Sequence, residues 1–154
     1  MMTNEELTTT IQNWYPDAEF VEEGSQFLNV FVPKDKVLEI ATKLKEDEST
    51  KLDYMFNLTC VDWPDHFQMI YHLKSTELAH MLVLKVKLED KENPELETLC
   101  HLYRTAELHE REVYDLFGVK FLNHPDLRRI FLTDDWIGHP LRKDYVDEIN
   151  IVSL

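Results

Sequence analysis

The chain has 154 residues, of which 44% are hydrophobic and 11% aromatic, which is enough for one domain with a core and too few for two. Its formal net charge of −14 repels nucleic-acid phosphates and anionic lipids, so we expect no nucleic-acid partner. No apolar run approaches the roughly 20 residues that cross a bilayer, and the first residues lack a signal-peptide pattern. We therefore expect a cytoplasmic protein that meets a membrane only through a partner.

The first part of the chain predicts two helices and two short strands. Thr3 and Glu6 have capping-box spacing, which predicts a helix that runs to Trp14. Residues 18–21 and 28–32 have the composition of short strands, with their turn at Gly24. Pro33 then opens a second helix, in which the apolar residues recur at helical spacing: Val37, Ile40, Ala41 and Leu44.

Three segments with alternating apolar and polar residues follow, at 54–60, 67–73 and 82–88. Their short links favour antiparallel neighbours in a sheet. Asn93 and Pro94 then predict the start of a helix that continues to Gly118, either unbroken or broken near Thr105.

These elements predict an α+β fold, with helices packed on one face of a mostly antiparallel sheet. We expect this α+β domain to comprise residues 1–121. An irregular C-terminal extension for docking to partner subunits follows, over residues 122–154.

Arginine is confined to the last third of the chain. Residues 1–103 contain nine lysines, no arginine and twenty acidic residues, whereas residues 104–145 contain all five arginines. Lysine suits a solvated surface, but the planar guanidinium of arginine suits paired, partly buried sites and is enriched at protein interfaces. The last third is therefore not ordinary surface.

Carboxylates near these arginines leave two interpretations open. Glu112 and Asp115 share a face of the predicted helix, and with His124 or His139 they could surround a metal ion in a free-standing enzyme. We favour a salt-bridge network with the arginines, because no third ligand follows the carboxylates at helical spacing.

Other cofactor motifs are missing from the sequence. Cys60 and Cys100 are 40 positions apart without a Cys-x-x-Cys motif, and the three glycines are scattered. We therefore expect neither an iron-sulfur ligand set nor a phosphate-binding loop.

Three blocks of the last third resemble one family. EREVYDLFGVKF (Glu110 to Phe121), HPDLRRIFL (His124 to Leu132) and DWIGHPLRKDY (Asp135 to Tyr145) resemble the signature of the C subunit of NADH-quinone oxidoreductase, respiratory complex I. LTCVDW (Leu58 to Trp63) resembles a weaker block of the same family. Asn123 is a departure, since glycine is common at that position.

The resemblance implies a non-catalytic structural subunit in the peripheral arm of a proton-translocating complex that transfers electrons from NADH to quinone. NAD, iron-sulfur clusters and quinone would belong to partner subunits, and this chain would bind no cofactor. The implied location is peripheral, on the cytoplasmic side of the cell inner membrane. A homologous subunit of an energy-converting hydrogenase or of a photosynthetic-type complex is the alternative.

On this resemblance, the last third docks onto cluster-bearing and quinone-site subunits through charge-assisted bonds and apolar anchors. We expect no catalytic or metal-binding residue in the chain. The expected partner interface comprises Glu110, Arg111, Glu112, Asp115, His124, Asp126, Arg128, Arg129, Asp135, Trp136, His139, Leu141, Arg142, Lys143, Asp144 and Tyr145.

Overall fold

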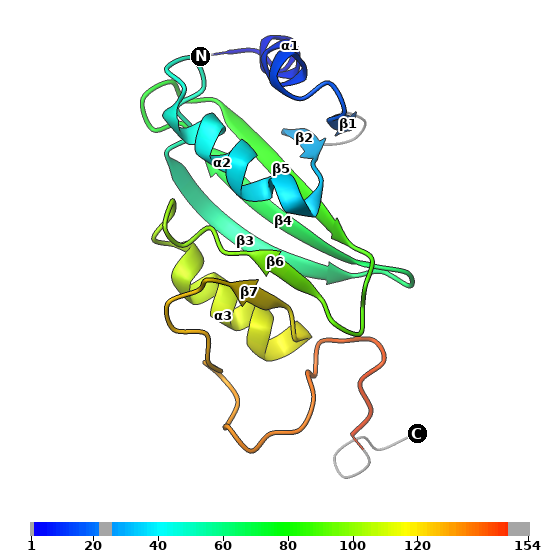
Figure 1. Ribbon diagram of the computed structural model, residues 1–154. Helices are drawn as coiled ribbons and strands as arrows, with labels where there is room; N and C mark the ends of the chain where they lie inside the picture. The colour runs from blue at the N-terminus through cyan, green and yellow to red at the C-terminus, as the bar shows by residue number, and fades with distance from the viewer. Residues whose placement is uncertain (1, 22–25, 148–154) are drawn as a thin grey trace.

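A five-stranded sheet forms the centre of the computed structural model, which describes residues 2–21 and 26–147 (Figure 1). The predicted turn at Gly24 and residues 148–154 of the predicted extension lie outside the described residues. The strand order is β1-β2-β5-β4-β3. The strands are β1 (Glu19–Val21), β2 (Leu28–Phe31), β3 (Tyr54–Asp62), β4 (Phe67–Lys74) and β5 (Met81–Leu88).

The sheet is mostly antiparallel, as predicted. β3, β4 and β5 form the expected meander, with Leu58 opposite Tyr71 and Tyr71 opposite Leu84. β1 is antiparallel to β2, whereas β2 runs parallel to β5. A parallel pair needs a long connection between its strands, and here the chain passes through a helix and two further strands before it returns as β5.

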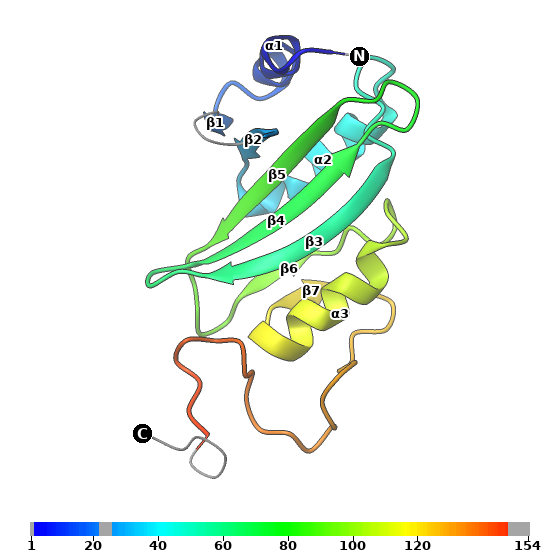
Figure 2. The ribbon, with the colours of Figure 1, turned by 180° about the vertical axis from the view of Figure 1, so that it is seen from behind.

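Helices pack on one face of this sheet and beside its edge. α1 (Asn4–Trp14) begins with the predicted capping box of Thr3 and Glu6. The 3₁₀ helix η1 (Lys34–Lys36) leads into α2 (Val37–Glu46), which crosses one face of the sheet (Figures 1 and 2). α3 (Ala106–Phe117) lies beside β3 and contacts it. The α+β class predicted from the sequence is confirmed.

The predicted helix start at Asn93 was wrong. The backbone amides of Glu92 and Asn93 donate to the Asp90 carboxylate, which makes a turn at this point. The strand β6 (Glu95–Glu97) follows and pairs in parallel with β7 (Lys120–Leu122). Leu96 lies on this strand and is buried. This apolar residue fitted the helical pattern of the sequence, but it faces the core from an extended backbone. The helix itself begins at Ala106.

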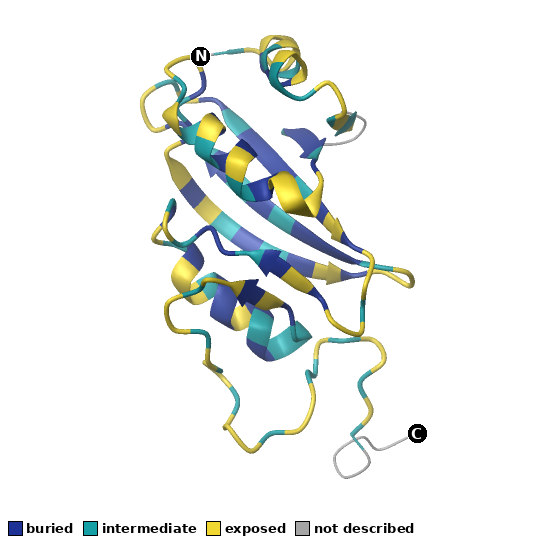
Figure 3. Ribbon diagram, in the orientation of Figure 1, coloured by how far each residue is buried: buried dark blue, intermediate teal, exposed yellow. Residues whose placement is uncertain are grey.

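Burial alternates along the central strands (Figure 3). Phe67, Met69, Tyr71 and Leu73 of β4 are all fully buried and face the side that carries α2. Leu84 of β5 is fully buried opposite Tyr71. The core therefore lies between this face of the sheet and the helices, and the other face carries no helix (Figure 2).

Leu84→Ala tests this core. Because Leu84 is fully buried on a central strand, we expect the free energy of unfolding to fall by about 2 to 5 kcal/mol. Leu108→Ala is the control, since Leu108 is 54% exposed and its loss should change stability by less than about 0.5 kcal/mol. Urea unfolding measures both, and equal effects would contradict the assigned core.

Candidate docking site

Residues 123–147, here called the C-terminal strap, contain neither helix nor strand. The strap starts after β7, passes along α3 and turns back toward the end of β3 (Figure 1). Irregular backbone leaves many polar groups without ladder partners. The site is therefore defined by the side chains that form hydrogen bonds with the backbone of the strap.

Asp115 of α3 is the main anchor of the strap. Its side chain is fully buried, and its Oδ2 accepts hydrogen bonds from the backbone amides of Ile130, Phe131 and Leu132 at 3.1, 2.7 and 3.0 Å. Its Oδ1 accepts from Arg129 Nη1 at 2.8 Å. Burial alone raises the pKa of Asp115, but the amide donors and the Arg129 guanidinium outweigh it, so the pKa lies below its ordinary value.

Arg111 lies four residues earlier on the same face of α3 and holds the preceding residues of the strap. Its Nε donates to the carbonyl of Arg128 at 3.1 Å, and its Nη2 donates to the carbonyl of Arg129 at 3.0 Å. One turn of helix thus presents a cation to strap carbonyls and an anion to the amides that follow.

Arg129 closes the next part of the strap into a loop. Its Nη2 donates to the carbonyls of Trp136 and Gly138, both at 3.0 Å. The His139 ring lies with Nδ1 2.9 Å from the carbonyl of Asp115. Gly118 ends α3 with φ +80°, and a Cβ there would meet this ring at 2.6 Å, so glycine is required for the close approach.

A second anchor lies at the end of β3. Asp62, which is 4% exposed, accepts a hydrogen bond from the backbone amide of Lys143 at 2.8 Å and pairs with Lys91. Arg142 packs over the Phe67 ring at 5.0 Å and donates to the Lys91 carbonyl at 3.0 Å. The far end of the strap is therefore attached to the sheet.

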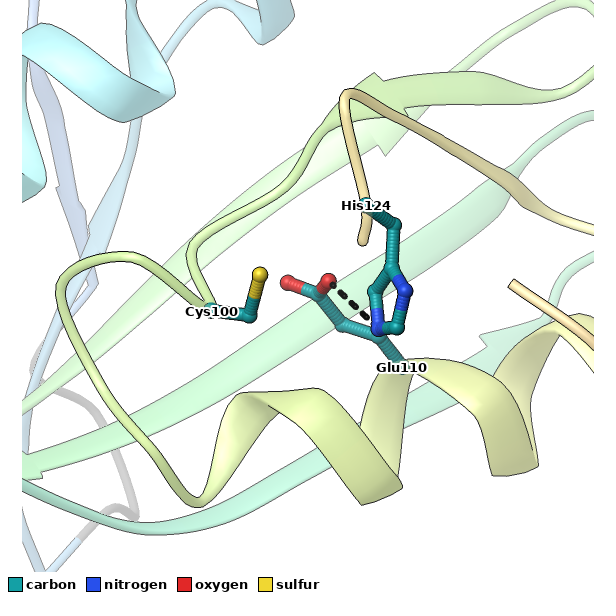
Figure 4. Close-up of side chains that lie close together, drawn as sticks. All are labelled: Cys100, Glu110 and His124. Atoms are coloured by element: carbon teal, nitrogen blue, oxygen red, sulfur yellow. Dashed lines mark ion pairs between the residues drawn. The ribbon is translucent and has the colours of Figure 1, made fainter. Parts of the chain in front are cut away.

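A third attachment joins the start of the strap to the body (Figure 4). The side chains of Cys100, Glu110 and His124 place a sulfur, a carboxylate and an imidazole within 4.8 Å of one another. Glu110 is fully buried, and its carboxylate accepts from the Thr98 hydroxyl and from the Leu99 amide. Burial raises the pKa of Glu110 to about 7, although both hydrogen bonds lower it.

Hydrogen bonding fixes the proton of His124. The Asp126 amide donates to His124 Nδ1 at 3.0 Å, so the neutral ring carries its proton on Nε2, which lies 3.0 Å from the Glu107 carbonyl. Neither ring nitrogen then offers a free lone pair to a metal ion between Cys100 and Glu110. The geometry favours a hydrogen-bonded joint over a metal centre.

The other predicted metal ligands are not brought together. Glu112 is exposed on α3, whereas both oxygens of Asp115 are occupied by the strap. The salt-bridge interpretation of Asp115 is thus the one that the geometry favours, with Arg129 as the partner at 2.8 Å.

Apolar side chains on the strap point outward. Phe131 is 64% exposed, Ile137 88%, Leu141 53% and Val146 74%. The Arg128 side chain is 66% exposed and pairs only with its neighbour Asp126 among the described residues. Exposed apolar side chains beside an arginine have the composition of a protein interface.

The structure divides the residues of the predicted interface into three groups. Seven fasten the strap to the body: Glu110, Arg111, Asp115, His124, Arg129, His139 and Arg142. Seven are exposed: Glu112, Asp126, Arg128, Asp135, Leu141, Lys143 and Asp144. Trp136 and Tyr145 are half-buried.

Sequence reasoning missed Asp62 and Thr98 as anchors. Asp62 could have been found, because it occupies an inward position of β3 in step with Leu58 and Cys60, and an inward acidic residue on a strand needs a partner. Thr98 gave no such signal, since it lies outside the regular elements, directly after β6.

A small domain whose buried charges hold an irregular segment with apolar residues outward has the features of a docking subunit. Comparisons with known protein families and solved structures lead to the same class of protein. The family described as "Respiratory-chain NADH dehydrogenase, 30 Kd subunit" matches residues 30–149. The chain belongs to this family, and the resemblance to the C subunit of NADH-quinone oxidoreductase is confirmed.

Relatives cover most of the chain. The NADH-quinone oxidoreductase C subunit of Moorella thermoacetica is 42% identical over 88% of this chain and 90% of its own length. The C subunit of Geobacter sulfurreducens is 43% identical over 77% of this chain and 74% of its own. The C/D subunit of Phocaeicola vulgatus is 39% identical over 77% of this chain, which spans only 23% of that protein.

Solved structures share the fold. A chain of the membrane-bound sulfane sulfur reductase, an archaeal respiratory membrane complex, matches with a TM-score of 0.75 and 29% identity over 94% of this chain and 86% of its own. A trypsin-resistant fragment of Nqo5 matches with a TM-score of 0.67 and 24% identity over 81% of this chain and all of its own. Among the described residues, no helix is long and apolar enough to cross a membrane.

Asp115→Asn tests the main anchor. The amide keeps the shape of the side chain but leaves Arg129 without its anion, at a cost of about 3 kcal/mol for breaking a buried pair. The open form of the strap should then rise about a hundredfold. Tryptic cleavage after Arg128 and Arg129, which follows the open population when opening is fast, measures this, with exposed Glu112→Gln as the control. Equal cleavage rates in the two variants would contradict the anchor.

Glu110→Gln tests the joint through pH. Because the pKa of Glu110 is raised from 4.5 to about 7, between these values the folded chain keeps a proton that the unfolded chain has released. The contribution of this carboxyl to stability is therefore complete below pH about 4.5 and is lost as pH rises to about 7, by about 3 kcal/mol. The difference in unfolding free energy between wild type and variant should show this slope, and Glu107→Gln should not. Parallel profiles for wild type and Glu110→Gln would exclude the raised pKa.

Proposed function

We propose that this chain is a structural subunit in the peripheral arm of an NADH-quinone oxidoreductase-type complex, where the C-terminal strap docks onto neighbouring subunits. One observation carries the proposal: the charged groups of the strap are largely satisfied within the chain, while its apolar side chains point outward. A segment fastened in this way loses little conformational freedom on binding, which favours affinity.

In this proposal the chain itself has no catalytic residue. The buried acid Asp115 is occupied by amides and by Arg129, and the carboxylate of Glu110 by Thr98 and Leu99. Cys60 is buried, which raises the pKa of its thiol to about 12, so it offers no thiolate at neutral pH. NAD, iron-sulfur clusters and quinone are accordingly assigned to partner subunits.

The proposed partners are the cluster-bearing and quinone-site subunits of the peripheral arm. The chain would lie on the cytoplasmic side of the cell inner membrane and contact it only through the complex. The match to the sulfane sulfur reductase, a respiratory membrane complex, supports a second candidate, in which the complex reduces an acceptor other than quinone. The companion subunits distinguish the two.

Charge placed on the outward side of the strap tests the proposal. Ile137 is 88% exposed and Phe131 64%, so Ile137→Asp and Phe131→Asp should leave the free energy of unfolding within about 0.5 kcal/mol. In an interface the same charges would be desolvated, so we expect recovery of companion subunits with the tagged chain to fall by tenfold or more, for about 1.4 kcal/mol or more of lost binding.

The measurement is affinity purification of the tagged chain from gently solubilised membranes, with mass spectrometry of its companions. Thr9→Asp is the control, because it adds the same charge at an exposed residue of α1, which lies at the opposite end of the molecule from the strap (Figure 1). Wild-type recovery of companions by both strap variants would refute docking through this surface.

A further inference from the structure

The open face of the sheet carries no acidic side chain on its three longest strands. In the register of the meander, the side chains opposite to the core face are Tyr54, Phe56, Asn57, Thr59, Val61, Gln68, Ile70, His72, Lys74, Met81, Val83, Lys85 and Lys87. We call these residues the outer sheet face. The chain has 30 acidic and 16 basic residues, so three strands with three lysines and no carboxylate on this face depart from the rest of the molecule. On the edge strand β1, Glu19 lies opposite Phe31 and shares this face.

Aromatic and apolar side chains of the outer sheet face are partly exposed. Tyr54 is 47% exposed, Phe56 37% and Val61 36%. The Phe56 ring stacks on Tyr54 with centroids 6.5 Å apart and lies 5.5 Å from the His72 ring. Strands hold these rings in place, and rigid aromatic clusters are typical of the residues that dominate interface energies.

The lysines of this face form no ion pair within the described part of the chain: neither Lys74 nor Lys85 nor Lys87 has a carboxylate at salt-bridge distance there. The ammonium groups of Lys85 and Lys87 instead stand 5.5 and 4.9 Å from the centre of the Phe31 ring. Lys85 is half-buried, and burial lowers the pKa of its ammonium group. Two cations thus stand beside the Phe31 ring, and the hollow that Phe31 and Lys87 line also carries the carboxylates of Glu19 and Asp90.

We propose that the outer sheet face is a second docking surface, which binds a carboxylate-bearing surface of a companion subunit. This inference rests on the proposed function but uses residues separate from the strap. Charge complementarity identifies the partner: acidic proteins are repelled by most of this chain, and the outer sheet face offers them lysines that form no ion pair of their own. Its aromatic residues would supply the apolar part of the contact.

Zero-length cross-linking of the purified complex with a carbodiimide tests this directly, because the reagent joins a lysine amine to a carboxylate only where the two are in contact. We expect cross-linked peptides that join Lys85 or Lys87 to an aspartate or glutamate of a companion subunit. Lys87→Arg should keep companion recovery and remove the Lys87 cross-link, since arginine keeps the charge but does not react.

A charge reversal completes the test. Lys87→Glu should lower recovery of companions severalfold, whereas Lys34→Glu, at an exposed lysine of η1, should leave it unchanged. The inference is overturned if Lys85 and Lys87 are acetylated as fast in the complex as in the isolated chain. Loss of companions from the wild-type chain would instead refute the proposed function, so the two failures are distinguishable.

Discussion

One buried carboxylate organises the part of the molecule that distinguishes it from a plain α+β domain. Asp115 accepts hydrogen bonds from three consecutive amides of the strap and from Arg129, while Arg111 on the same helix face binds the two preceding carbonyls. A buried ionised group is tolerated only when its lone pairs are satisfied. The strap and the helix therefore depend on each other: without the strap, Asp115 would be an unpaired charge.

In this arrangement, one set of side chains attaches the strap to the body, and a different set is left exposed for the proposed contact with a partner. Charged side chains that turn inward fix the path of the strap, and the exposed residues Phe131, Ile137 and Leu141 are thereby held at defined positions on the surface. A free tail with the same sequence would have to be ordered when it binds, and that cost would reduce affinity. The outer sheet face offers a second rigid surface. In the proposed function, the strap and the outer sheet face would contact two different neighbours.

Sequence patterns predicted local structure better than the contacts that cross the chain. Period-two alternation identified β3, β4 and β5, and the capping box identified α1, because both signals lie within one element. Leu96 fitted a helix equally well, and its strand forms only through parallel pairing with β7, which is distant in sequence. Likewise Arg111 and Asp115 were predicted as interface residues, but their partners include backbone groups of residues 128–132. Backbone groups are the same in every residue, so the sequence could not indicate these partners. Asp62 alone could have been predicted as an anchor from the sequence, because it is an acidic residue at an inward position of a strand.

Amide hydrogen exchange of the isolated chain tests the central claim most directly, namely that the strap is organised before any partner binds. The amides of Ile130, Phe131 and Leu132 should exchange slowly in wild type, because each donates to buried Asp115. Ile137 is 88% exposed, and its amide donates no hydrogen bond to any described residue, so it serves as the internal reference. Exchange of all four at the rate of unstructured peptide would show that the strap is ordered only by its partners, and would contradict the account.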